Sequence, residues 1–82
     1  MNNLPVYRCQ MTVSAVQIKE IKYNGEGNFY IDPVNQALSP IPIGYDFIKT
    51  YNPAQGGYYI LRDNGFEFYL GEKEFEENFL LI

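Results

Sequence analysis

The sequence predicts an α+β fold: a small, curved antiparallel β-sheet with one short central helix and one C-terminal helix. Three observations lead to this prediction. Segments rich in Val, Ile, Thr and Tyr alternate with clusters of turn-forming residues, as strands and hairpin loops do. The spacing of apolar residues changes to a helical period after Gly71. The 82 residues, 46% of them hydrophobic and 17% aromatic, suffice for a single domain over residues 1–82 with one core.

The first strand region covers residues 6–23. Its apolar residues alternate, but the alternation changes parity between Ala15 and Val16. Such a change predicts either a β-bulge or the passage of one strand into a second. The turn formers at residues 24–28 then predict a hairpin loop, which brings residues 27–32 back against the preceding strand.

The segment of residues 33–44 is expected to be an extended loop or an edge strand. It contains Pro33, Pro40 and Pro42, and each proline removes a hydrogen-bond donor that a central strand would need. Three apolar side chains are expected to hold this segment on the body of the domain, namely Leu38, Ile41 and Ile43.

A short helix is predicted from Asp46 to about Tyr51. Asp46 is expected to be its N-cap, because a side-chain carboxylate can accept a hydrogen bond from a free backbone N–H of the first turn. Phe47, Ile48 and Tyr51 fall on one side of this helix, and Asn52-Pro53 ends it. Because the helix is so short, it needs tertiary packing to be stable.

A second hairpin is predicted at residues 58–70, with a two-residue turn at Asn64-Gly65 that has positive φ at both positions. In this register Arg62 lies opposite Glu67. One face then collects the apolar side chains Tyr59, Leu61, Phe68 and Leu70. A three-residue turn would set Leu61 opposite Glu67 and mix polar and apolar residues on each face, so the two-residue turn is preferred.

The C-terminal segment predicts a helix that lies across the sheet. Phe75, Phe79 and Ile82 are spaced i, i+4 and i+7, which places them on one helical face. Glutamates in the first turn of this segment suit the positive end of a helix dipole. The sequence leaves open whether residues 79–82 end as helix or as an additional strand.

The net charge of −4 is concentrated at the C-terminal end. Residues 1–66 hold five basic and five acidic residues, whereas residues 67–82 hold five glutamates and one lysine. An acidic end disfavours direct binding to nucleic acid. There is neither a long apolar stretch nor a basic and apolar N-terminal leader, so the sequence predicts no membrane association and a cytoplasmic protein in a host cell.

The residue types present argue against an enzyme. The chain has no His and one Cys, so it lacks the usual general base, the commonest metal ligand and a thiolate cage, and no catalytic, cofactor-binding or metal-binding residue is expected. Asp32, Asp46 and Asp63 are each explained by a turn or a cap. A calcium loop that begins at Asp63 would lack the glycine at its sixth position. Cys9 is expected to be a half-buried apolar side chain.

The eight tyrosines suggest a surface that binds a partner, because tyrosine combines a large apolar body with a polar tip. Tyr58 and Tyr69 are expected to point away from the face that carries Leu61 and Phe68. They form an exposed aromatic patch unless the helix at residues 47–51 covers them, and the sequence leaves both alternatives open. The candidate partner-binding residues are Tyr58, Ile60, Arg62, Tyr69, Glu72 and Glu76.

Four segments carry a recognisable pattern: Tyr7-Arg8, a Val-Ser-Ala-Val-Gln-Ile stretch at residues 13–18, Pro-Ala-Gln-Gly-Gly-Tyr-Tyr-Ile at residues 53–60, and Glu-Lys-Glu-Phe-Glu at residues 72–76. Together they resemble a loose group of short proteins of unknown function encoded by bacteriophages and prophages. The matching residues are mostly turn formers and core positions. The resemblance therefore implies a fold and a phage origin, and it transfers no catalytic residue.

Three functions agree with these observations. The preferred hypothesis is a non-enzymatic, phage-encoded protein that blocks a host protein, such as a defence complex, by occluding it. The first alternative is a protein that sequesters a nucleotide signal in an aromatic-lined pocket, within one chain or at a homo-oligomer interface. The second alternative is a minor virion or assembly component.

Overall fold

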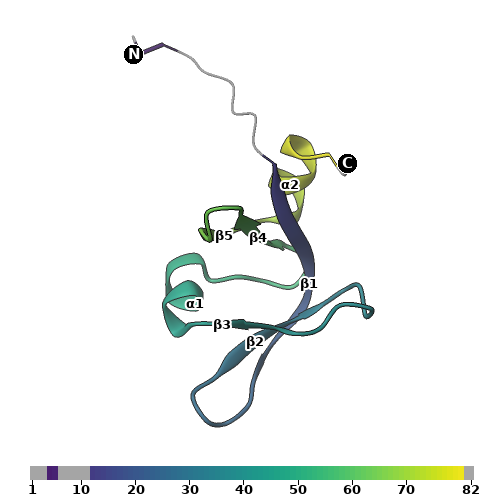
Figure 1. The fold of residues 1–82 in the computed structure, drawn as a ribbon, viewed down its shortest axis with the longest axis vertical. Coiled ribbons are helices and arrows are strands. Elements are labelled where there is room, and N and C mark those ends of the chain that lie inside the picture. The colour runs from purple at the N-terminus through teal and green to yellow at the C-terminus, as the bar shows by residue number, and fades with distance from the viewer. Residues whose placement is uncertain (1–3, 6–11, 81–82) are drawn as a thin grey trace.

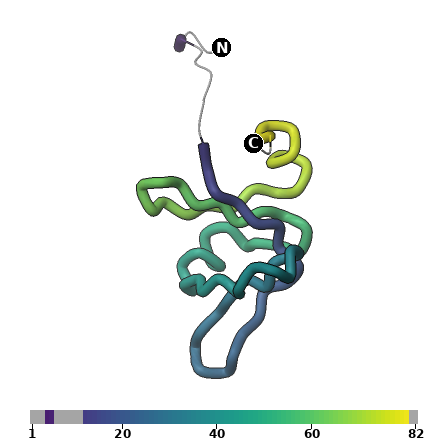
Figure 2. Tube along the Cα trace, turned by 45° about the vertical axis from the view of Figure 1, so that its right-hand side comes forward, coloured from purple at the N-terminus to yellow at the C-terminus, as the bar shows by residue number. Residues whose placement is uncertain are grey.

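The structure is a computed structural model that describes residues 4–5 and 12–80 (Figure 1). Its elements follow in the order β1 (Val13–Tyr23), β2 (Phe29–Pro33), β3 (Ile41–Ile43), α1 (Tyr45–Tyr51), β4 (Tyr58–Arg62), β5 (Glu67–Leu70) and α2 (Glu72–Asn78). The strands form one antiparallel sheet in the order β3-β2-β1-β4-β5, which is strongly curled (Figure 2). The predicted α+β class, with one central and one C-terminal helix, is confirmed.

Some predictions fall on residues that the structure does not describe. They are the start of the first strand before Thr12, the Tyr7-Arg8 match, the environment of Cys9, and the position of Ile82. Of the segment at residues 79–82, Phe79 and Leu80 are described and belong to neither a helix nor a strand, because α2 ends at Asn78 and the backbone of Phe79 is extended.

Strand β1 changes its partner along its length. Residues 13–17 pair with β4, and residues 18–23 pair with β2 on the opposite side of β1. The register with β2 shifts between Ile18 and Glu20, which is a bulge within one continuous strand. Of the two alternatives that the sequence left open, a bulge is observed, but it does not lie at Ala15 and Val16, where β1 pairs with β4 in unbroken register.

Two adjacent residues of β1 hold the halves of the sheet together. The Ile18 N–H donates to the Gly57 carbonyl at 2.8 Å, and the Gly56 N–H donates to the Ile18 carbonyl at 2.8 Å. On the other side of the strand, the Val34 N–H donates to the Gln17 carbonyl at 2.9 Å. The Ile18 side chain is fully buried in a core cluster that draws on both halves and on α1, formed by Ile18, Ile31, Ile43, Phe47 and Tyr59.

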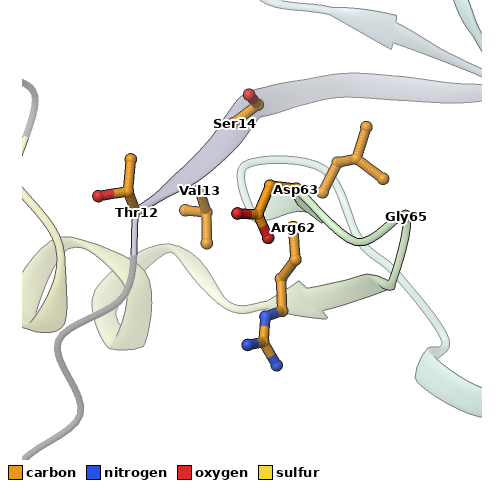
Figure 3. A pocket seen from close by; sticks show the side chains of 7 residues that line it. Thr12, Val13, Ser14, Arg62, Asp63 and Gly65 are labelled. Atoms are coloured by element: carbon orange, nitrogen blue, oxygen red, sulfur yellow. The ribbon is translucent and has the colours of Figure 1, made fainter.

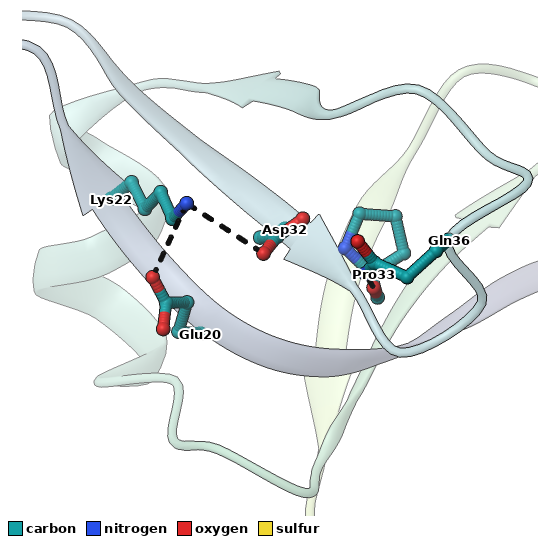
Figure 4. A network of polar contacts seen from close by, with 5 residues as sticks. All are labelled: Glu20, Lys22, Asp32, Pro33 and Gln36. Carbon is teal, nitrogen blue, oxygen red and sulfur yellow. Dashed lines mark hydrogen bonds and ion pairs between the residues drawn. The ribbon is translucent and has the colours of Figure 1, made fainter.

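Across β1 and β2, one cation offsets a pair of like charges (Figure 4). Glu20 lies directly opposite Asp32, an arrangement that destabilises a sheet when it is not compensated. The Lys22 ammonium lies 3.5 Å from the Glu20 carboxylate and 3.8 Å from that of Asp32. These two carboxylates, Asp32 first, raise the pKa of Lys22 above its ordinary value.

The proline-containing segment behaves largely as predicted. Strand β3 lies at the edge of the sheet and pairs only with β2 among the described strands. Ile43 is buried and Ile41 is half-buried, so both hold the segment on the core. The same expectation for Leu38 is wrong, because this side chain is 43% exposed on the loop before β3.

Helix α1 begins at Tyr45, two residues earlier than a cap at Asp46 would place it. Gly44, not Asp46, is the N-cap residue, and no side chain caps the helix there. The assignment of Asp46 as the cap is therefore wrong, and its carboxylate lies in the first turn, where the helix dipole favours a negative charge. The predicted end is confirmed: Asn52 has a φ of 45° and donates its N–H to the Ile48 carbonyl at 2.8 Å.

The register predicted for the β4–β5 hairpin is wrong by one residue. Leu61 lies opposite Glu67 and Tyr59 lies opposite Tyr69, as a three-residue turn requires, so the expected Arg62–Glu67 pair does not form. Gly65 alone has positive φ in this turn, and its N–H donates to the Arg62 carbonyl at 2.9 Å.

This register tolerates mixed polarity because both faces of the hairpin are covered. On the α1 side, Tyr59 packs against Phe47 with ring centroids 5.5 Å apart. The half-buried Glu67 lies on that same side, where its carboxylate accepts a hydrogen bond from the Tyr59 hydroxyl. The Tyr51 hydroxyl donates to the Glu67 backbone carbonyl at 3.4 Å. Glu67, the polar residue that made this register look unfavourable, thus receives hydrogen bonds from two tyrosine hydroxyls.

The approach of Tyr69 to Gly57 generates a stability prediction. A Cβ added at Gly57 would lie 2.3 to 2.6 Å from atoms of the Tyr69 ring, and the φ of Gly57 is outside the positive region, so the conflict is steric. We expect Gly57→Ala to lower the free energy of unfolding by about 1–3 kcal/mol, the usual cost of overpacking. Urea denaturation followed by circular dichroism measures this change.

Gly71→Ser is the matched control, because a Cβ at Gly71 meets nothing within 4 Å and serine is a good N-cap for α2. Its free energy of unfolding should stay equal to that of the unmodified protein or rise slightly. Equal stabilities of the Gly57→Ala variant and the unmodified protein would contradict the packing of Tyr69 on Gly57.

Candidate partner-binding surface

Helix α2 is attached to the start of β4 by stacked aromatic rings. The Tyr58 and Phe75 rings are nearly parallel, with centroids 3.9 Å apart, and the Phe75 and Phe79 rings are stacked with centroids 4.8 Å apart. The i, i+4 spacing of the two phenylalanines brings their rings together. All three side chains are half-buried, so each leaves part of its surface accessible. We call Tyr58, Phe75 and Phe79 the α2 aromatic stack.

Glutamates of α2 make hydrogen bonds to the sheet beside this stack. The Tyr58 hydroxyl donates to Glu76 Oε2 at 2.7 Å. The Gln17 side-chain amide donates to Glu72 Oε2 at 3.3 Å and to the Gly56 carbonyl at 3.0 Å. The hydrogen bond to Glu76 is the main reason why the pKa of Tyr58 is raised to about 12, and burial adds to it.

The α2 aromatic stack has an acidic border. Glu72 and Glu76 form this border and are exposed despite their hydrogen bonds. Glu74 and Glu77 are exposed glutamates of the same helix whose side chains make no hydrogen bond to the stack within the described residues. Lys73 is the one basic residue of α2. The border therefore concentrates negative charge around accessible aromatic surface, which suits a partner with a basic and partly apolar surface.

The six predicted site residues do not form one surface. Tyr58, Glu72 and Glu76 come together on the α2 side, whereas Ile60 has no exposed area and contributes nothing to a surface. Arg62 is exposed near the turn of the β4–β5 hairpin.

Tyr69 lies on the α1 side of the sheet. It is paired with Tyr59, and its hydroxyl accepts a hydrogen bond from the Ala54 N–H at 3.3 Å. The prediction that Tyr58 and Tyr69 share a face is therefore wrong, because the register is shifted by one residue.

The sequence left open whether a helix covers the face of Tyr58 and Tyr69 or leaves it exposed, and the structure shows a helix on each side. The helix at residues 45–51 covers the side of Tyr59 and Tyr69, and α2 lies over the side of Tyr58. Sequence reasoning missed Phe75 and Phe79 as surface residues, because their helical spacing was read only as packing against the sheet. The signal that points to them is the row of acidic residues beside that apolar spacing.

A second group of aromatic side chains lies where β1 ends, β2 begins and α1 begins. The β1–β2 loop that follows β1 lies at the opposite end of the molecule from α2 (Figure 1). The Tyr23 and Phe29 ring centroids are 4.8 Å apart, and those of Phe29 and Tyr45 are 6.2 Å apart. Tyr23 is 56% exposed and Tyr45 is 62% exposed. We call Tyr23, Phe29 and Tyr45 the hairpin aromatic cluster, which sequence reasoning did not identify.

A shallow hollow of about 350 Å³ lies between the start of β1 and the β4–β5 turn. It is lined by Thr12, Val13, Ser14, Leu61, Arg62, Asp63 and Gly65. No lining residue is aromatic, and Figure 3 shows the Arg62 guanidinium directed away from β1. The hollow therefore lacks the stacking surface that the nucleotide-sequestering hypothesis requires.

Within residues 4–5 and 12–80, no cluster of three or more potential metal-ligating side chains is present. None of the helices in this part of the chain has the length and apolar character that crossing a membrane requires.

The fold described above is similar to that of a solved phage protein. No protein-family model and no curated protein matches the chain. A solved structure of the phage L decoration protein, determined by NMR in its monomeric form, matches with a TM-score of 0.57 and 28% sequence identity. The match covers 82% of this chain and 49% of that protein, so the chain spans about half the length of its structural neighbour. This finding supports the phage association that the resemblance implied.

The hydrogen bond between Tyr58 and Glu76 predicts a specific titration. In the folded protein the Tyr58 hydroxyl should lose its proton at about pH 12, whereas an unperturbed tyrosine has a pKa of 10.0. Stabilisation by this group is fully present below pH 10 and is lost as the pH rises from 10 towards 12. The tyrosinate absorbance of the protein minus that of a Tyr58→Phe variant isolates this titration.

Glu76→Gln is the matched control, because it keeps the side-chain shape and removes the charge. In this background the difference titration should move towards pH 10. If Tyr58 titrates near pH 10 in the unmodified protein while circular dichroism still shows the folded state, the contact between α2 and β4 is not as described.

Proposed function

We propose that this chain is a phage virion component that binds a phage capsid, in the manner of a decoration protein. The observation that carries the proposal is the similarity in fold and sequence to the phage L decoration protein, which extends over most of this chain. The proposal corresponds to the virion alternative raised by the sequence. The partner is then a capsid protein, and the place of action is the particle.

The α2 aromatic stack and its glutamates are the surface that we assign to this contact. Aromatic residues are enriched in protein interfaces, because they bury a large area with little loss of conformational entropy. The acidic border would steer the chain towards a basic region of the capsid protein, and it would make the association rate sensitive to salt. We propose that binding alone performs the function, without catalysis.

The other two hypotheses have less support. The comparisons provide nothing that favours occlusion of a host protein, and the hollow beside β1 offers no aromatic lining for a nucleotide. Association of several copies of the chain stays a prediction. The virion proposal is the one that agrees with both the resemblance and the solved structure.

Co-sedimentation with purified capsids of the encoding phage tests the proposal. We expect the unmodified chain to sediment with capsids, and Phe79→Ala to weaken the apparent affinity by about tenfold, because a buried interface aromatic commonly contributes more than 1 kcal/mol. The double variant Glu72→Lys/Glu76→Lys should bind more weakly and lose its salt dependence.

Tyr45→Ala is the matched control, since it removes one exposed ring from the hairpin aromatic cluster, which lies on β1, β2 and α1 and not on α2. This variant should sediment with capsids as the unmodified chain does. Failure of the folded, unmodified chain to sediment with capsids contradicts the proposed function. Equal binding by Phe79→Ala, or a loss confined to Tyr45→Ala, contradicts the assigned surface.

A further inference from the structure

The sequence Asn-Gly occurs twice, at residues 24–25 in the β1–β2 loop and at residues 64–65 in the β4–β5 turn. All four residues are exposed. Asn-Gly is the dipeptide in which a backbone nitrogen most readily attacks the preceding side-chain amide, because glycine has no side chain to obstruct the approach. Each site is therefore a candidate for spontaneous deamidation.

The two asparagine side chains have the same local geometry. Asn24 Oδ1 accepts a hydrogen bond from the Glu26 N–H at 2.9 Å, and Asn64 Oδ1 accepts one from the Phe66 N–H at 3.0 Å. Both are side-chain turns of the kind that asparagine forms with the residue two positions later. The following glycines also agree, with φ values of 83° and 88°. None of these features distinguishes the two sites.

The backbone N–H groups of Gly25 and Gly65 differ in their hydrogen bonding. The Gly65 N–H donates to the Arg62 carbonyl at 2.9 Å, inside a tight turn that the hydrogen bond from the Arg62 N–H to the Phe66 carbonyl also closes. In the described part of the chain, the Gly25 N–H has no hydrogen-bond partner. Its loop is closed in the same way, by the Asn24 N–H donating to the Asn28 carbonyl at 3.1 Å, but Gly25 is the first of the three enclosed residues, whereas Gly65 is the last of its three.

We propose that Asn24 is a site of spontaneous deamidation in the folded protein and that the hydrogen bond of Gly65 protects Asn64. The Gly25 nitrogen gives up its proton and forms a bond to Asn24 Cγ. The side-chain nitrogen leaves as ammonia, and a succinimide remains. Water then opens one of the two C–N bonds of the ring, which yields aspartate or isoaspartate at position 24. The reaction consumes one water and needs neither an oxidant nor a reductant.

The product changes the end of the β1–β2 hairpin. A new carboxylate joins Glu26 in the loop and lies next to Tyr23 of the hairpin aromatic cluster. Isoaspartate also lengthens the main chain by one atom, which alters the closure between residues 24 and 28. Ageing of the protein therefore modifies this end faster than it modifies the β4–β5 turn.

Incubation at mildly alkaline pH tests the proposal within one molecule. Tryptic peptides that begin at Tyr23 and at Asp63 separate the two sites, and fragmentation spectra locate the gain in mass at Asn24 or Asn64. We expect conversion at Asn24 to be faster than at Asn64 by at least about twofold, the lower end of what one net backbone hydrogen bond supports. The Asn24→Gln variant should lose the fast conversion.

A parallel incubation in urea gives the unfolded reference, and it continues until both sites have converted measurably. There the two rates should become similar, because the hydrogen bond of Gly65 is lost. Equal rates in the folded protein, or faster conversion at Asn64, overturn the proposal. If Asn24 still converts faster than Asn64 in urea, the difference in rate comes from the local sequence and the proposal is overturned. The proposal is also overturned if Asn24 does not convert in the folded protein.

Discussion

The architecture depends on the hydrogen bonds that Gln17 and Ile18 make in the middle of β1. The Ile18 backbone pairs with Gly56 and Gly57, the Gln17 carbonyl accepts from Val34, and the Gln17 side chain reaches Glu72 of α2. One strand thereby joins two half-sheets that extend in opposite directions from this point. The fully buried Ile18 side chain anchors the shared core, because apolar residues of both halves and of α1 pack around it. The position of α2, and with it the candidate surface, follows from this junction.

Features with a strong local cause were predictable from the sequence. Turn formers located the β1–β2 loop, prolines placed β3 at an edge, and Asn52-Pro53 ended α1. A bulge was one of two predicted alternatives, but its position between Ile18 and Glu20 was not predicted, because the parity change at Ala15 and Val16 falls where β1 pairs with β4 without a break. The N-cap residue of α1 was not predicted correctly, since an extended Gly44 needs no side-chain hydrogen bond to begin the helix.

The register of the β4–β5 hairpin could not be predicted from the sequence, because it depends on which elements pack on the two faces of the hairpin. Alternation of polarity fixes a register when one face is buried and the other is solvated. Here α1 covers one face and α2 the other, and Glu67 is satisfied on the α1 side by the Tyr59 hydroxyl. The shift of one residue separated Tyr58 from Tyr69, which lies on the opposite face. Of the other predicted residues, Ile60 is buried and Arg62 is exposed near the turn. The predicted residues that the structure brings together are Tyr58, Glu72 and Glu76, beside α2.

We propose that the chain acts by binding a capsid through α2 and the start of β4. Amide hydrogen exchange of the chain, free and bound to purified capsids of the encoding phage, tests this proposal. We expect slower exchange on capsids at residues 72–80 and at Tyr58, with unchanged exchange at residues 24–28. Identical exchange with and without capsids, or slowing confined to the β1–β2 loop, would contradict it.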